Sequence, residues 1–153
     1  MAHRAASLIF AAGLAAALGA ARAQPQPRPQ DAEPTPQHSA DCVAALEVEA
    51  IAMADQLRAG KTEIEPELVR RVQQGFAFIG VAYKQGLRKE EADKLLKQAE
   101  ANTQTLPQDE LAARQAACQA EGARLLANAN FFERAFVAHA AQRRVDRLKK
   151  PKT

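Results

Sequence analysis

Apolar residues recur along most of this chain at the three- and four-residue spacings of an α-helix. No run of alternating β-branched residues is long enough to predict a strand. The first helical segment extends from Ser39, which can serve as N-cap, to about Arg58, and Gly60 follows its end. Its apolar residues fall on one side of the helix: Cys42, Val43, Leu46, Ala50, Met53, Ala54 and Leu57.

A second helix is predicted from Pro66, which suits the first turn, to Gly86. Residues 76–83 are apolar around most of the circumference, so we expect this helix to be the most buried. Gly75 and Gly80 would let a neighbouring helix come close, at a cost of roughly 1 kcal/mol each relative to alanine. The apolar stripe consists of Leu68, Val72, Phe76, Ile79 and Tyr83.

A third, short helix is predicted to begin near Arg88 and to end before Pro107, with acidic residues in its first turn. Residues 102–105 are polar and β-branched, which argues against extending the helix through them. Its narrow apolar face consists of Ala92, Leu95, Leu96 and Ala99.

The last helical stretch runs from about Pro107 toward Lys150, as one bent helix or as two. Asn130, with Glu133 three residues later, matches the N-cap and reciprocal partner of a fresh helix, so the pattern leaves both forms open. A single apolar stripe can be followed through Leu111, Cys118, Gly122, Leu125, Ala129, Phe132 and Phe136. If the stretch breaks, the apolar side of the second piece is Phe131, Ala138, Ala141, Val145 and Leu148.

The two cysteines of the predicted helical region, Cys42 and Cys118, lie within the apolar stripes of the first and last helices, and we predict a disulfide between them. In the chain-entropy model, closing the loop between Cys42 and Cys118 contributes about 4.5 kcal/mol of stability. Thiol–disulfide oxidoreductases usually use a Cys-x-x-Cys turn, so the wide separation favours a structural bond. The predicted fold is a small all-α bundle of four helices, or five if the last stretch breaks, closed by this disulfide.

The first 23 residues have the layout of a secretory signal peptide. His3 and Arg4 precede an apolar run of about 14 residues, shorter than the roughly 20 that a membrane-spanning helix needs. The run is followed by Ala21-Arg22-Ala23, a small-x-small cleavage site, and no cysteine for lipid attachment comes directly after it. We expect cleavage after Ala23 and export to the periplasm or the medium, where the disulfide can form.

Cleavage would leave 130 residues, a common size for one domain. Residues 24–38 contain five prolines and are predicted to form a disordered Pro/Gln-rich spacer. Residues 39–150 are the predicted helical domain, and residues 151–153 are a basic tail.

The net charge of the predicted mature chain is close to zero, because Arg4 and Arg22 leave with the leader and 19 basic side chains then face 18 acidic ones. Basic residues nevertheless crowd the last part of the chain, and some continue one helix face beyond two phenylalanines. A solvated helix end, whose cations suit the helix dipole, is the simpler interpretation. The alternative is contact with a partner or an anionic surface through Phe132, Phe136, Arg143, Arg147 and Lys150.

We predict no catalytic residue, no metal site and no cofactor, because motifs for zinc hydrolysis, covalent haem, serine hydrolysis and nucleotide binding do not occur. Met53 and His139 superficially resemble the haem ligands of exported cytochrome bundles. If the disulfide sets Cys42 level with Cys118, these side chains lie about 16 Å and about 31 Å along their helices, too far apart to bracket one haem.

We therefore expect an exported, non-catalytic helical protein with a binding or accessory role in the bacterial cell envelope. Its partner would be an envelope protein or peptide, or an anionic membrane surface, and nucleic acid is not expected in that compartment. The alternative is a periplasmic holdase-like stress chaperone. Acid-activated periplasmic chaperones are also small, helical and closed by one disulfide, which is a likeness of architecture alone.

Overall fold

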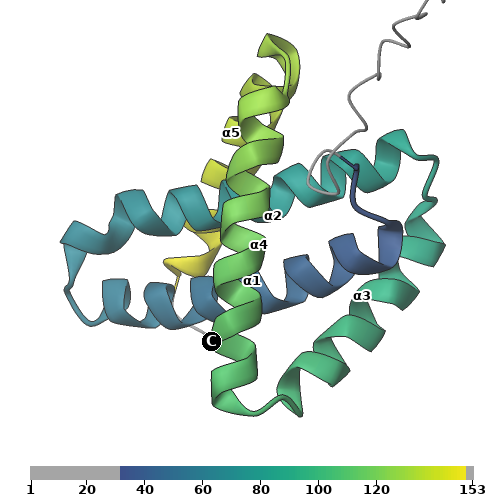
Figure 1. Ribbon diagram of the computed structural model, residues 1–153. Helices are drawn as coiled ribbons and strands as arrows, with labels where there is room; N and C mark the ends of the chain where they lie inside the picture. Colours follow the sequence, from purple (N-terminus) through teal and green to yellow (C-terminus); the bar gives the residue numbers. More distant parts are fainter. Residues whose placement is uncertain (1–31, 151–153) are drawn as a thin grey trace, which may run out of the picture. The chain divides into compact units, whose positions relative to one another are not determined.

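The computed structural model describes residues 32–150, which form five α-helices and one short 3₁₀ helix, with no strand among them (Figure 1). In chain order the elements are α1 (Pro36–Arg58), η2 (Thr62–Ile64), α2 (Glu65–Lys84), α3 (Lys89–Gln104), α4 (Gln108–Asn128) and α5 (Phe131–Leu148). The all-α prediction is confirmed. The predicted leader (1–23), most of the predicted spacer (24–31) and the basic tail (151–153) lie outside the described residues.

The first helix begins earlier than the sequence pattern predicts. The hydroxyl of Thr35 accepts a hydrogen bond from the backbone N–H of His38, so Thr35 is the N-cap, and Pro36 occupies the first turn. The prediction that Ser39 caps this helix is therefore wrong, because Ser39 lies inside α1 and is buried. Residues 36–38, assigned above to the spacer, belong to the helix.

Glycines end both α1 and α2, as predicted. Gly60 and Gly86 have φ values of +94° and +90°, left-handed conformations that residues with a Cβ rarely adopt. A short turn through η2 joins α1 to α2, and the two helices run antiparallel (Figure 1). α2 also contacts α4 and α5, so the helix that is apolar around most of its circumference packs against three neighbours.

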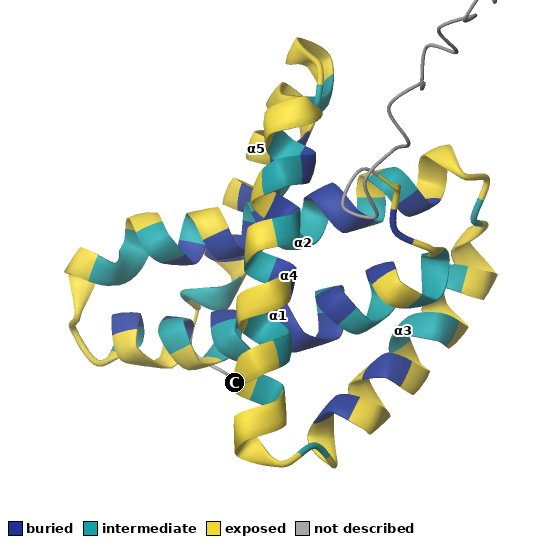
Figure 2. Cartoon of the chain, viewed as in Figure 1, coloured by how far each residue is buried: buried dark blue, intermediate teal, exposed yellow. Residues whose placement is uncertain are grey.

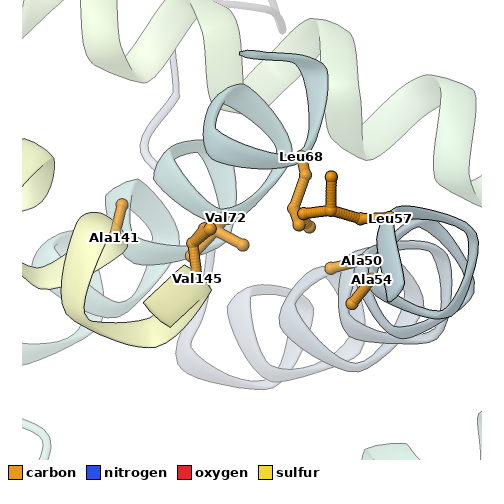
Figure 3. Close-up of a cluster of buried hydrophobic side chains, with 7 residues drawn as sticks. All are labelled: Ala50, Ala54, Leu57, Leu68, Val72, Ala141 and Val145. Atoms are coloured by element: carbon orange, nitrogen blue, oxygen red, sulfur yellow. The ribbon is translucent and has the colours of Figure 1, made fainter. Parts of the chain in front are cut away.

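Two clusters of buried side chains stabilise the bundle. One lies where α1, α2 and α5 meet and consists of Ala50, Ala54, Leu57, Leu68, Val72, Ala141 and Val145 (Figure 3). The other lies where α1, α2 and α4 meet and consists of Cys42, Leu46, Ala77, Phe78, Cys118 and Leu125. Because α1 and α2 each contribute to both clusters, this antiparallel pair forms the centre on which α4 and α5 pack.

α3 contacts α1 and buries only a narrow line of residues (Figure 2). Ala99 is fully buried, and the other members of the predicted face are partly buried. The helix continues to Gln104, so the argument against extending it beyond residue 101 is wrong. Thr103 is buried inside the helix, although a β-branched side chain has a weak helix propensity.

The last helical stretch is two helices, and the predicted capping box separates them. Asn130 Oδ1 accepts the N–H of Glu133, and Glu133 Oε2 accepts the N–H of Asn130. Phe131 and Ala138, predicted on the apolar side of the second piece, are exposed instead. The buried side of α5 consists of Val137, Ala141 and Val145.

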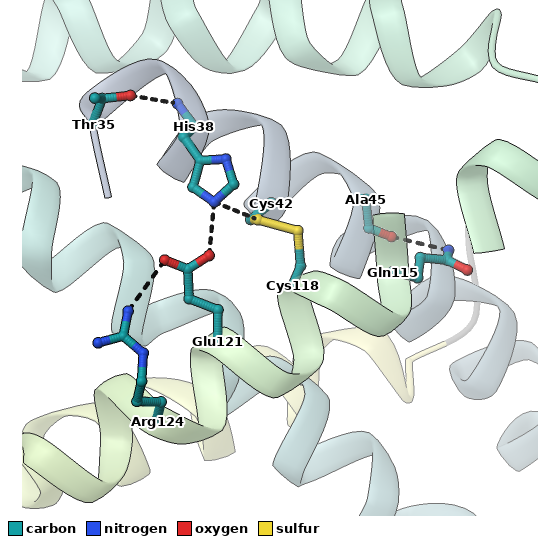
Figure 4. Close-up of a disulfide and its surroundings, with 8 residues drawn as sticks. All are labelled: Thr35, His38, Cys42, Ala45, Gln115, Cys118, Glu121 and Arg124. Atoms are coloured by element: carbon teal, nitrogen blue, oxygen red, sulfur yellow. Dashed lines mark hydrogen bonds and ion pairs between the residues drawn. A yellow bond between two sulfur atoms is a disulfide. The ribbon is translucent and has the colours of Figure 1, made fainter. Parts of the chain in front are cut away.

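The predicted disulfide joins Cys42 of α1 to Cys118 of α4, with Cα atoms 5.3 Å apart (Figure 4). Both cysteines are buried. No free cysteine lies among the described residues, so no neighbouring thiol is at hand to exchange with this bond. The bond therefore acts as a structural link between two helices that are far apart in the sequence.

The closest approach of two helices at a glycine occurs at Gly122 of α4, not at Gly75 or Gly80 as predicted. A Cβ added to Gly122 would lie 2.8 Å from the Cβ of Gln74, whereas nothing lies within 4 Å of a Cβ at Gly75 or Gly80. Gln74 reinforces the crossing, because its Nε2 donates to the carbonyl of Gln119 over 3.1 Å.

Alanine substitutions at two of these glycines should have opposite effects. Gly122→Ala should lower the free energy of unfolding by about 1–2 kcal/mol, because the new methyl group must displace Gln74 close to its backbone. Gly80→Ala should raise it by about 0.5–1 kcal/mol, because the helix gains propensity at an open position. Urea unfolding measures both changes, and two changes of the same sign would contradict this crossing of α2 and α4.

Candidate functional site

The side of α5 that faces away from the core carries four of the five contact residues predicted from the sequence. At about 100° per residue, Val137, Ala141 and Val145 mark the buried side of the helix. The opposite side carries Phe132, Phe136, His139, Arg143 and Arg147, all exposed, which we call the α5 outer face. Lys150, the fifth predicted residue, follows the end of α5 and is exposed as well.

Three phenylalanines project into solvent from the first turns of α5. Phe131, Phe132 and Phe136 are 72%, 81% and 71% exposed. The rings of Phe131 and Phe132 meet edge to face with centroids 5.7 Å apart. The predicted continuation of the α4 core stripe through Phe132 and Phe136 is wrong, because Asn130 starts a new helix whose buried side consists of other residues. Contiguous exposed aromatic surface of this kind marks interaction sites.

A shallow, open hollow lies beside Phe136. It has a volume of about 280 Å³ and is lined by Phe76, Phe136, His139, Ala140, Arg143 and Arg147. Phe76 comes from α2, so two helices form this part of the surface. Sequence periodicity placed Phe76 in a stripe of core positions and gave no sign that it borders an exposed site.

The arginines of α5 differ in their surroundings. Arg144 forms an ion pair with Glu47 of α1, which helps to hold α5 on the bundle. Arg143 and Arg147 pair with no acidic side chain among the described residues. Two guanidinium groups therefore stand at the hollow with their donors directed to solvent or to a ligand.

Glu133 fixes the start of α5, next to the exposed phenylalanines. Its carboxylate accepts the N–H of Asn130 and forms an ion pair with Lys84 at the end of α2. The Lys84 side chain first, and then the Asn130 N–H, hold the pKa of Glu133 below its ordinary value. The phenylalanines are thereby held at a defined place beside α2.

A buried polar network joins α1, α2 and α4. The guanidinium of Arg71 lies 3.0 Å from the carboxylate of Glu49 and 2.8 Å from that of Glu67, and it donates to Gln74 over 2.7 Å. Gln119 donates to the same Glu49 carboxylate over 2.8 Å. Each charge is already paired, so we assign this network a structural role. Periodicity did not reveal it, because Arg71 falls outside the predicted apolar stripe.

No protein-family model matches this chain, and no curated protein and no solved structure is detectably similar to it. Within the described residues, no helix combines the length and the apolar character needed to cross a membrane. The candidate site is therefore defined by the geometry of the α5 outer face and the hollow beside it.

The contacts of Glu133 should make the start of α5 sensitive to acid. Because its pKa is lower in the folded chain than in the unfolded one, Glu133 contributes stability above pH 4.5, and this contribution is lost as the pH falls through the lowered value. Thermal melts above and below pH 4.5 should show a smaller acid-induced loss of stability for Glu133→Gln than for the wild type. Glu100→Gln, which changes an exposed carboxylate of α3, should keep the wild-type profile, and a wild-type profile for Glu133→Gln would contradict this assignment.

Proposed function

We propose that this protein is an exported, non-catalytic helical protein that binds a partner in the bacterial cell envelope through the α5 outer face. The observation that carries the proposal is the combination of two strongly exposed phenylalanines, Phe132 and Phe136, with Arg143 and Arg147 on the same helix face. Aromatic residues, phenylalanine included, and arginine are enriched in protein interfaces relative to the rest of the surface.

The chemistry of this face specifies what a partner must offer. Phe132 and Phe136 require an apolar surface, and burial of each side chain is worth about 1.5–3 kcal/mol. Arg143 and Arg147 require carboxylates or other anionic groups, which a guanidinium can bind with two parallel hydrogen bonds. The hollow beside Phe136 gives such a partner a place to insert a side chain. We therefore propose an envelope protein or peptide that presents an apolar segment next to acidic residues.

An anionic membrane surface is the other partner with matching chemistry. Arg143, Arg147 and Lys150 would each contribute roughly 1 kcal/mol at such a surface. A shallow, largely apolar hollow bordered by two arginines suits an inserted apolar side chain better than a bilayer surface, and for this reason we place the protein partner first.

Export and the lack of catalysis rest on separate features. Export rests on the leader-like sequence of residues 1–23 and is supported by the disulfide, since such bonds persist mainly in oxidising compartments. His139, the histidine of the α5 outer face, makes no hydrogen bond to another described residue. Nothing among the described residues orients His139 as an acid or base, which supports binding rather than catalysis at the α5 outer face.

A holdase-like stress chaperone is the second candidate, and Glu133 is the observation that favours it. Protonation of Glu133 at acid pH would loosen the start of α5 beside three exposed phenylalanines. Such a chaperone would suppress the aggregation of several unrelated unfolded proteins, and acid would strengthen the suppression. A protein that binds one partner would show neither property.

Removal of the two phenylalanines should weaken partner binding without affecting the fold. F132A/F136A should weaken the affinity for the partner by at least about tenfold. The free energy of unfolding should change by no more than about 0.5 kcal/mol, because both side chains are exposed. The partner would be identified in the native host by cross-linking from a photoreactive phenylalanine analogue at position 131, and its affinity then measured by titration.

Matched variants make this experiment specific. The same analogue at Tyr83, an exposed aromatic position on α2, should not capture the partner. Reversal of charge at Arg143 and Arg147 should weaken binding, whereas reversal at Lys94 and Lys97 on α3 should not. A captured protein that binds F132A/F136A as tightly as the wild type would refute the role of this face. Binding to anionic but not neutral vesicles, without a captured protein, would replace the protein partner with a membrane surface.

A further inference from the structure

A second group of chemically reactive side chains surrounds the disulfide. His38 and Cys42 lie four residues apart on α1, and Cys118 and Glu121 lie three residues apart on α4, so each pair occupies one face of its helix. Figure 4 shows the four side chains converging. His38 Nε2 lies 2.7 Å from Glu121 Oε2 and 3.7 Å from Cys42 Sγ. The ligand atoms of His38, Cys42 and Glu121 all lie within 4.8 Å of one another.

The oxidised chain cannot use these sulfur atoms as thiolate ligands, because they are bonded to each other. A small dithiol can reduce the bond through a mixed disulfide. The bond between Cys42 and Cys118 then breaks, each sulfur gains a proton and an electron from the reductant, and the reductant closes to its own cyclic disulfide. The reduced chain presents two thiols, one imidazole and one carboxylate at the same place.

We propose that the reduced chain binds Zn²⁺ at this place, with His38, Cys42, Cys118 and Glu121 as the four ligands. Zn²⁺ in proteins is typically held by four ligands in a tetrahedron, and thiolate sulfur, imidazole nitrogen and carboxylate oxygen are its usual donors. Binding releases the two thiol protons. Arg124 Nη2, which lies 3.4 Å from Glu121 Oε1, offsets the negative charge that the three anionic ligands leave around the divalent ion.

The spacing of the ligand atoms of His38, Cys42 and Glu121 is close to what zinc requires. Bonds of about 2.0–2.3 Å to zinc place the donors of a tetrahedral site about 3.3–3.8 Å apart. His38 Nε2 and Cys42 Sγ already have this separation. The carboxylate of Glu121 must withdraw from His38 by less than about 1 Å, and the two sulfur atoms separate once their bond is broken.

The proposed site borders solvent on one side and the core on the other. The side chain of His38 is 50% exposed and that of Glu121 is 24% exposed, whereas both cysteines are buried, so a metal ion would reach the sulfur atoms past these two side chains. The same two cysteines would therefore hold α1 against α4 in both redox states, as a disulfide when oxidised and as zinc ligands when reduced. This inference does not depend on the function proposed for the α5 outer face.

Metal titrations of the purified, untagged protein test the proposal. The reduced protein, kept under anaerobic conditions, should bind one ion per chain, and Co²⁺ should give thiolate charge-transfer bands and the visible bands of tetrahedral coordination. Zn²⁺ should displace Co²⁺ and raise the melting temperature of the reduced chain. The oxidised protein should show none of these effects. If reduction unfolds the chain, Zn²⁺ should restore the helical circular-dichroism signal, and failure to do so would overturn the proposal.

Single variants distinguish a four-ligand site from two thiols that bind metal on their own. H38A and E121Q should each weaken the zinc affinity of the reduced chain by at least about tenfold. H139A, which removes an exposed histidine from α5, should leave it unchanged. Circular dichroism shows whether each variant remains helical. Unchanged zinc affinity in folded H38A and E121Q, or the lack of thiolate bands in a folded reduced chain, would overturn the proposal.

Discussion

The bond between Cys42 and Cys118 compensates for a core that is built largely from small side chains. Half of the buried positions of α1 are alanine, and alanine buries little apolar area. A loop closed over this many residues is worth about 4.5 kcal/mol in the chain-entropy model, against roughly 5–15 kcal/mol for the whole stability of a typical domain. The same bond positions α4 against α1, next to the contact between Gly122 and Gln74 that places α4 on α2.

The position of α5 depends on this arrangement, because α5 packs mainly on α2. Only one narrow side of α5 is buried in that contact. Ion pairs from Arg144 to Glu47 and from Lys149 to Glu65 add to that attachment. Because the core takes up so little of α5, most of its circumference remains in solvent, including all three of its phenylalanines. The two proposals therefore concern separate parts of the fold: partner binding uses α5, and metal binding uses the junction between α1 and α4.

The glycine ends of α1 and α2, the start of α5 and the disulfide could be predicted from the sequence, because their signals are local or few in number, whereas the start of α1 and the end of α3 were predicted wrongly. Gly60, Gly86 and the Asn130–Glu133 capping box each act within one turn, and the two cysteines of the helical region leave one pairing. Contacts between helices could not be predicted, since periodicity shows which side of a helix is apolar but not which neighbour covers it. The features missed for this reason are the close approach at Gly122, the burial of Arg71 and Thr103, the place of Phe76 at the hollow, and the pairing of His38 with Glu121.

Intact-mass spectrometry of the protein purified from its native host without reductant tests the link between α1 and α4 most directly. When the protein is unfolded in the presence of an alkylating agent, we predict that no alkyl group is added until a reductant is supplied, and that both cysteines are then modified. The same spectrum should give the mass of a chain that begins at Gln24. Alkylation of Cys42 and Cys118 without reductant, on a chain that still carries its first 23 residues, would contradict both the disulfide and the proposed export.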